Sequence, residues 1–332
     1  MRLPRFELLQ PRSVIEAVES LAQHGLSAKV AAGGTDLFPR MKYGVAGPEV
    51  VVSLKGLPVK SPAVSPEGYL SISALMTLAD VIGSDVVREK APLLVQAAFA
   101  VGSNQIRHMG TLGGNLCLEN RCVYYNQSHQ YQFVEPCFKR NGNLCYLIPK
   151  GKKCWAVSAA DTVPALMALN AQVVIEGPGN NRYLTLDALY GGDSLRPLTI
   201  GPAEVVTDVR IPLPPDGRRA AFVKFSQRGG LEFALVNVAV LMDLADDRQT
   251  CLGARISVSG VSSGPIRAKK AEAALVGQKV SRDLFQAAAE TTANEIVPMP
   301  RFEFSMPYVR KCVEVQSRDA LALAIAGPIS NQ

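Results

Sequence analysis

Two glycine-rich turns place the tightest constraint on how this chain can fold. The first, AAGGTDL, spans residues 31–37, and the second, GTLGGNL, spans residues 110–116. A glycine pair lets the backbone N–H groups approach a ligand closely, and a helix that follows adds partial positive charge that suits a phosphate. Neither turn matches G-x-G-x-x-G or the P-loop, and Gly-Gly pairs also occur in ordinary tight turns. Each turn is therefore either a pyrophosphate cradle or a simple chain reversal.

The apolar patterning divides the 332 residues into three lobes, because a single core seldom grows beyond about 250–300 residues. Residues 1–57 predict a β-α-β lobe with a helix behind Ser13. Residues 58–216 predict a second lobe that opens with a turn-rich linker at 58–68. Residues 217–332 predict an α+β lobe. Its expected strands are 220–227, 233–244 and 252–260, and its expected helices are 266–276, 282–296 and 308–326.

Composition indicates a soluble protein of the cytoplasm. The chain is 48% hydrophobic and 19% charged, and it contains no apolar run of about 18 residues. Proline and acidic residues interrupt the first twenty positions, so we expect no secretory signal. The net charge of +6 is modest and has no long basic block, which predicts neither a membrane nor a nucleic-acid partner. In a reducing cytoplasm, clustered cysteines are more often metal ligands or redox groups than disulfides.

Four of the seven cysteines fall within residues 121–155. They are separated by fourteen, seven and eight residues, which matches none of the compact C-x-x-C patterns of common zinc and ferredoxin sites. Four thiolates suit zinc and an iron-sulfur cluster equally well, and the thiols can also be unliganded. The four candidates are Cys122, Cys137, Cys145 and Cys154.

The neighbours of these cysteines favour an anionic cluster over zinc. Basic side chains would lower the cost of a negatively charged centre, and aromatic side chains would limit water around it. The same residues are also compatible with a solvated loop or a nucleic-acid patch. The basic residues are Arg121, Lys139, Arg140, Lys150, Lys152 and Lys153, and the aromatic residues are Tyr124, Tyr125, Tyr131, Phe133, Phe138 and Tyr146.

The remaining cysteines lie outside this grouping. Cys251 and Cys312 are in apolar strand and helix contexts, which predicts packed thiols. Cys117 lies only five residues before Cys122 and is a possible competing ligand.

Taken together, these motifs resemble the FAD-binding medium subunits of the xanthine dehydrogenase family of molybdenum enzymes. The resemblance runs from end to end, and within the family it is greatest to the β subunit of 4-hydroxybenzoyl-CoA reductase. AAGGTDL resembles the first pyrophosphate loop of the family and QIRHMGTLGGNL the second. DTVPAL at 161–166 and the F-x-K-x-x-x-R pattern at 222–228 match two further family segments. About forty residues, near 118–156, separate the second loop from Asp161, where most members have almost none.

The resemblance implies a two-lobed FAD-binding domain of the PCMH type, a C-terminal α+β lobe and a cysteine-rich insertion. The insertion would hold a [4Fe-4S] cluster on the four cysteines named above, with Cys117 left as a bystander. Judged by their local sequence, Asp161 is a helix cap before Pro164 and Lys224 an exposed strand residue, whereas the resemblance places both beside the flavin. The implied FAD contacts are Val30, Ala31, Ala32, Gly33, Gly34, Thr35, Asp36, Leu37, Val101, Thr111, Gly113, Gly114, Asn115, Asp161 and Lys224.

The activity that the resemblance implies is electron transfer. FAD and the cluster would exchange electrons with a low-potential donor such as ferredoxin. The organic substrate, an aromatic CoA thioester that loses its phenolic hydroxyl, would react on a large molybdopterin subunit. A small subunit with two [2Fe-2S] clusters would connect the two, in a dimer of heterotrimers. Two alternatives remain: the medium subunit of an aldehyde or N-heterocycle oxidoreductase, and a zinc-binding regulatory module.

Overall fold

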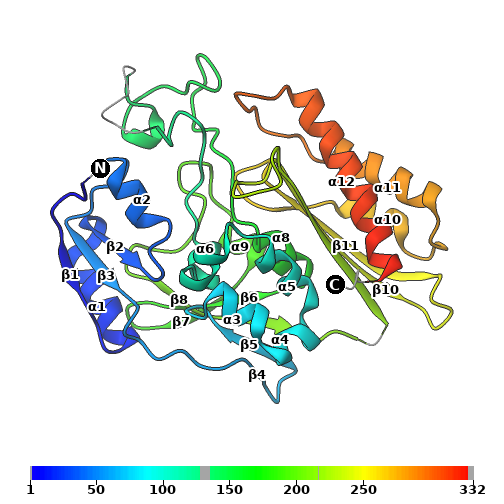
Figure 1. Ribbon diagram of the computed structural model, residues 1–332, viewed down its shortest axis with the longest axis horizontal. Coiled ribbons are helices and arrows are strands. Elements are labelled where there is room, and N and C mark those ends of the chain that lie inside the picture. The colour runs from blue at the N-terminus through cyan, green and yellow to red at the C-terminus, as the bar shows by residue number, and fades with distance from the viewer. Residues whose placement is uncertain (1, 128–134, 216, 328–332) are drawn as a thin grey trace.

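Three separate β-sheets organise the chain (Figure 1). The structure is a computed structural model that describes residues 2–127, 135–215 and 217–327. The sheets follow one another along the sequence, so each is built mainly from its own stretch of chain. The mixed α and β architecture expected from the sequence is confirmed.

The N-terminal sheet is parallel and has the order β1-β3-β2. Its strands are β1 (Glu7–Leu9), β2 (Ala28–Ala31) and β3 (Val50–Ser53). Helix α1 (Val14–His24) begins where the Ser13 hydroxyl accepts a hydrogen bond from the N–H of Glu16, a cap that contributes about 1 kcal/mol. The short helix α2 (Leu37–Lys42) follows β2 and the first glycine turn.

The middle sheet is antiparallel, with the order β4-β5-β8-β6-β7. Only a short turn connects β6 to β7, and such a turn permits only an antiparallel hairpin. The linker at 58–68 differs from expectation, because it contributes the edge strand β4. The strands are β4 (Ala63–Val64), β5 (Tyr69–Ser73), β6 (Gln172–Glu176), β7 (Asn181–Thr185) and β8 (Val205–Pro212).

Short helices pack on this middle sheet and carry the second glycine turn. The turn, residues 110–116, follows α6 (Asn104–Met109) directly and contains α7 (Leu112–Leu116), whose Leu112 and Leu116 are completely buried. The other helices are α3 (Leu78–Gly83), α4 (Asp85–Lys90), α5 (Pro92–Phe99), α8 (Val163–Ala168) and α9 (Leu186–Leu189).

The C-terminal sheet is antiparallel, in the order β12-β11-β10-β9, and α12 packs across β9 and β10 (Figure 1). The three expected strands and the three expected helices occur in the expected order, and a short fourth strand, β12, lies between the two groups. The expected helix from residue 266 starts later, because residues 266–267 pair with β11 instead. The elements are β9 (Arg218–Phe225), β10 (Val236–Leu244), β11 (Cys251–Ser259), β12 (Ile266–Arg267), α10 (Lys269–Leu275), α11 (Arg282–Glu295) and α12 (Met306–Ala326).

Strand β10 joins the C-terminal part to the middle lobe, because both of its faces are buried. Val238 and Val240 point into the core beneath the C-terminal helices. Ala239 and Leu241 point into the core of the middle lobe. Successive side chains of a strand alternate between faces, so one apolar run serves two cores. This shared strand fixes the C-terminal part against the lobe that carries the second glycine turn.

The cysteine-rich insertion rises between the N-terminal and C-terminal parts at one edge of the molecule (Figure 1). Its neck is closed by two backbone hydrogen bonds between Arg121 and Val157, of 2.9 and 3.1 Å. Inside the described part of the insertion, the only helical element is the short 3₁₀ turn η3 (Phe138–Arg140). Side-chain contacts and loop backbone hydrogen bonds therefore hold the described part of the insertion more than regular secondary structure does.

Candidate cofactor site

The first glycine turn presents a row of backbone donors. Among the described residues, the N–H groups of Gly33, Gly34, Thr35 and Asp36 donate no hydrogen bond. The four residues are half-buried or exposed, and Gly34 has a φ of +70°, which favours glycine. Buried or half-buried N–H groups without a partner cost free energy unless water or a ligand accepts from them. The turn is thus suited to an anion with several oxygens.

The two glycine turns lie against each other. A Cβ built on Gly33 would lie 1.7 Å from the carbonyl oxygen of Met109 and 3.1 Å from the Cα of Gly110. A Cβ on Gly110 would lie 3.4 Å from the hydroxyl of Thr35. The close approach explains why glycine stands at both positions. The sequence predicted both turns, and the structure brings them to one place between the N-terminal and middle lobes.

The second turn uses its own backbone differently from the sequence-based expectation. The N–H of Gly113 donates to Ala74, that of Gly114 to the Thr111 hydroxyl, and that of Asn115 to the Thr111 carbonyl. All four of these turn residues are among the FAD contacts that the resemblance implies. In this structure they hold the turn and α7 together. Their contact with FAD stays a prediction, whereas the free donors belong to the first turn.

A buried polar cluster lies where the middle lobe meets the C-terminal sheet. Lys224 donates to Asp161 at 2.8 Å and to the carbonyl of Ala100 at 2.9 Å. Asn237, which faces Lys224 across β9 and β10, donates to the other oxygen of Asp161 at 2.8 Å. Burial raises the pKa of Asp161, while the ammonium of Lys224 and the amide of Asn237 act in the opposite direction. The cluster connects the segment before α8 to two strands of the C-terminal sheet.

This cluster overturns two interpretations based on local sequence. Asp161 is not the cap of α8, because Thr162 occupies that position, and Asp161 is 3% exposed. Lys224 is not an exposed strand residue, since its side chain is only 10% exposed. The sequence analysis did not identify Asn237 as part of the site. The signal that could have identified it is a single amide within the apolar run VNVAVLM of β10, because a buried polar group requires a partner.

The other predicted FAD contacts differ in how far they are buried. Ala31, Leu37 and Val101 are buried, and Ala32 is half-buried. Val30 is exposed on β2. The buried members belong to hydrophobic cores that hold the turns in place. Whether each contacts FAD stays a prediction.

All four cysteines of the insertion line one small pocket. The N–H of Tyr125 donates to the sulfur of Cys122 at 3.3 Å, and that of Ala156 to the sulfur of Cys154 at 3.5 Å. Aromatic side chains complete the walls together with Lys139. The sequence-based grouping is therefore reproduced in space. The pocket is lined by Cys122, Tyr124, Cys137, Phe138, Lys139, Leu144, Cys145, Tyr146, Leu147, Cys154, Trp155 and Ala156.

The thiols of this pocket influence one another electrostatically. Burial raises the pKa of Cys122 to about 11, and negative charge on Cys137 or Cys154 would raise it further. Burial also raises the pKa of Cys154, which the ammonium of Lys139 opposes. Across residues 2–127, 135–215 and 217–327, however, no three His, Cys, Asp or Glu side chains are arranged so that they could hold a metal ion. The pocket thus gathers the thiols without the tight convergence of a formed metal site.

The other three cysteines do not line the pocket. Cys251 and Cys312 are buried, which confirms the prediction of packed thiols. Burial raises the pKa of Cys117 to about 12, and it packs against the core of the middle lobe. Tyr131 and Phe133, two members of the expected aromatic shell, lie outside the described residues.

Comparison with known families identifies the cofactor of the chain. Residues 4–214 match the family described as the FAD binding domain in molybdopterin dehydrogenase, and residues 221–322 match the CO dehydrogenase flavoprotein C-terminal domain. The chain belongs to this family of flavoprotein subunits. The family assignment confirms FAD as a cofactor and the PCMH-type fold, and it identifies the chain as an oxidoreductase subunit.

Several members of the family are similar to the chain over most of its length. The FAD-binding subunit PaoB of the aldehyde oxidoreductase of Escherichia coli is 30% identical over 290 residues, covering 82% of this chain and 87% of PaoB. Subunit alpha of the 6-hydroxypseudooxynicotine dehydrogenase complex of Paenarthrobacter nicotinovorans is 27% identical, covering 98% and 96%. Carbon monoxide dehydrogenase from Hydrogenophaga pseudoflava has a chain that superimposes with a TM-score of 0.80 at 27% identity, covering 98% and 99%.

The names of two of these relatives describe subunits of larger enzymes: PaoB is a FAD-binding subunit, and the Paenarthrobacter nicotinovorans protein is a subunit of a dehydrogenase complex. No helix in the part of the chain that the structure describes is long and apolar enough to cross a membrane.

Proposed function

We propose that this chain is the electron-transfer subunit of a molybdenum-dependent reductase of the 4-hydroxybenzoyl-CoA reductase type. Such an enzyme removes the phenolic hydroxyl of an aromatic CoA thioester as water, which consumes two electrons and two protons. The observation that supports this reading is the pocket that gathers all four insertion cysteines beside a flavoprotein core. A second redox group in the same subunit suits a reaction driven by a one-electron donor.

In this proposal the residues divide into two sets. The free N–H groups of the first glycine turn bind the FAD pyrophosphate, and Asp161 and Lys224 set the charge beside the flavin. FAD, when bound, supplies chemistry that connects two-electron and one-electron steps. The four cysteines of the pocket would hold a [4Fe-4S] cluster once they converge more tightly than they do in this structure, and Lys139 would offset its negative charge.

The partners in this proposal are a large molybdopterin subunit and a small subunit with two [2Fe-2S] clusters, in a dimer of heterotrimers. The medium-chain names of the relatives support a multi-subunit complex. A low-potential carrier such as ferredoxin would be the electron donor, and the cytoplasm the location.

A second candidate is the medium subunit of an aldehyde or N-heterocycle oxidoreductase, in which electrons leave the substrate. The names of several relatives favour it, among them aldehyde oxidoreductase and nicotine 6-hydroxylase. Turnover by the purified complex separates the two. Reduction of 4-hydroxybenzoyl-CoA by a reduced donor supports the first, and oxidation of aldehydes or N-heterocycles without that reduction supports the second.

Metal content tests the cluster directly. We expect about four irons and four acid-labile sulfides per FAD in the complex beyond those of the small subunit, because a cubane contains four of each. One zinc per chain and no additional iron would instead identify the insertion as a zinc module and would remove the cluster from the proposal.

Replacing Cys145 with serine is expected to lower the iron content of this subunit by more than half while FAD remains bound. A hard hydroxyl is a poor ligand for a cluster that prefers soft thiolates. Iron, sulfide and FAD analysis of the purified subunit measures both. Cys117→Ala is the matched control, since Cys117 lies outside the pocket, and it should leave the iron content unchanged. An unaltered iron count in Cys145→Ser would exclude Cys145 as a ligand.

A further inference from the structure

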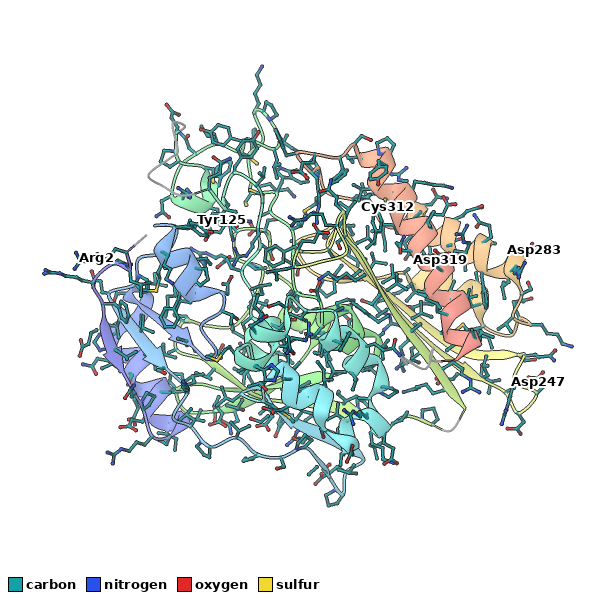
Figure 2. All side chains as sticks on the ribbon, viewed as in Figure 1. Arg2, Tyr125, Asp247, Asp283, Cys312 and Asp319 are labelled. Atoms are coloured by element: carbon teal, nitrogen blue, oxygen red, sulfur yellow. The ribbon has the colours of Figure 1, made fainter. Side chains whose placement is uncertain are left out.

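A cluster of charged side chains connects the first glycine turn to the cysteine-rich insertion. Arg40 of α2 contacts Asp36 at 3.3 Å, Glu119 at 3.5 Å and the hydroxyl of Tyr125 at 2.9 Å. Asp36 also forms an ion pair with Arg121 at the neck of the insertion. Figure 2 shows Tyr125 in the insertion beside α2. Arg40 therefore contacts the turn and the insertion at once.

The same network continues into the insertion. Lys139 of η3 forms an ion pair with Glu119, and its ammonium lies 5.3 Å from the centre of the Tyr125 ring. The side chain of Lys139 is 4% exposed and Tyr125 is 3% exposed. Lys139 also lines the cysteine pocket. The charged cluster thus runs without a break from the turn to the wall of that pocket.

The charges of this cluster affect how strongly the first glycine turn would bind an anion. Asp36 supplies one of the four free N–H groups, yet its side chain carries a negative charge. A carboxylate without a partner beside a pyrophosphate would repel it, and more strongly in a partly buried place than in water. Arg40 and Arg121 neutralise Asp36. With Glu119 and Lys139 included, three cations face two carboxylates, so the cluster has one net positive charge.

We propose that Arg40 is a positioning residue for FAD: it neutralises Asp36 at the pyrophosphate turn and anchors that turn to the insertion through Glu119 and Tyr125. The insertion is then a structural part of the FAD site. Because linkage is reciprocal, FAD binding also stabilises the insertion. This inference rests on the proposed binding of pyrophosphate at the first turn. It does not depend on which metal, if any, the cysteines hold.

The test is the FAD affinity of the isolated subunit, measured by titrating the FAD-depleted protein and following flavin fluorescence. Arg40→Met is expected to raise the Kd for FAD at least about tenfold, because Asp36 then keeps only Arg121 as a counter-charge and the cluster beside the ligand loses its net positive charge. Tyr125→Phe keeps every charge and removes one hydrogen bond to Arg40, so a smaller rise of about threefold is expected.

Charge rescue separates this role from a merely structural one. In Asp36→Asn/Arg40→Met the carboxylate is gone, and the Kd is expected to return to within about threefold of the wild type. Arg88→Met is the matched control: it breaks an exposed ion pair of 3.4 Å, between Arg88 and Asp85, and should leave the Kd unchanged.

The outcomes are distinct. Equal Kd values for the wild type and Arg40→Met would overturn the inference. So would an Arg40→Met defect that Asp36→Asn does not relieve, because Arg40 would then act only through folding. A wild-type subunit that binds no FAD would instead overturn the proposed function.

Discussion

Replacing Gly33 with valine is expected to raise the Kd for FAD by about a hundredfold. A Cβ at this position would meet the carbonyl oxygen of Met109 at 1.7 Å and its carbon at 2.6 Å. Both are backbone atoms that cannot move aside by a change of rotamer. The two glycine turns would have to separate, and the row of free N–H groups would lose its geometry.

The expected size of this effect follows from the cost of inserting volume into a packed contact. Overpacking costs about 1–3 kcal/mol, and 3 kcal/mol corresponds to a rise of about a hundredfold in Kd. Titration of the FAD-depleted subunit measures it, and thermal unfolding of the same preparation shows whether the protein is folded. We expect the protein to remain folded and to bind FAD more weakly, because the contact lies between two lobes with separate cores.

Gly47→Val is the matched control for this prediction. A Cβ at Gly47 has no heavy atom within 4 Å, and its φ is not in the positive region. The same change of size and shape should therefore leave FAD affinity unaltered. If Gly33→Val binds FAD as tightly as Gly47→Val, the close contact of the two turns does not form the cofactor site.

The parts of this site that were predictable from sequence are the motifs formed by residues close together in the chain. The two glycine turns were recognisable because a close backbone approach leaves glycine as the only residue that fits. The grouping of four cysteines in one pocket was suggested by their concentration, because four of the seven thiols fall within 33 residues of one insertion. Spacing could not fix their geometry or the metal, because neither is a property of the sequence interval.

The parts that were not predictable depend on contacts between distant residues. The buried polar cluster combines Asp161, which precedes α8, with Lys224 of β9 and Asn237 of β10. The pairing register of β9 and β10 places Lys224 opposite Asn237, which also contacts Asp161. From local sequence alone, Asp161 is explained as a helix cap and Lys224 as an exposed strand residue. For Asn237 the only local signal is a single amide within an apolar run. The charged contacts of Arg40 with Glu119 and Tyr125 span 79 and 85 residues and have no local signal.

Replacing Lys224 with methionine is expected to lower the free energy of unfolding by about 3–5 kcal/mol near neutral pH. The change removes the ammonium that faces Asp161 at 2.8 Å and leaves the carboxylate buried with only the Asn237 amide as a partner. Chemical denaturation with linear extrapolation measures the loss. Lys311→Met, which breaks an exposed pair with Glu314 at 2.6 Å, is the control and should cost less than about 1 kcal/mol.

The pH dependence of this loss identifies its cause. Burial raises the pKa of Asp161 above 3.8, its value in an unfolded chain, and removal of Lys224 should raise that pKa further. A carboxyl with a raised pKa binds its proton more tightly when folded, so its contribution to stability is most favourable at low pH and declines as pH rises through the folded pKa. The deficit of Lys224→Met should therefore shrink as pH falls from 8 toward the unfolded value. Adding Asp161→Asn should recover most of it at neutral pH. A deficit that is constant with pH and unaffected by Asp161→Asn would mean that Lys224 stabilises the fold through packing and the Ala100 carbonyl alone.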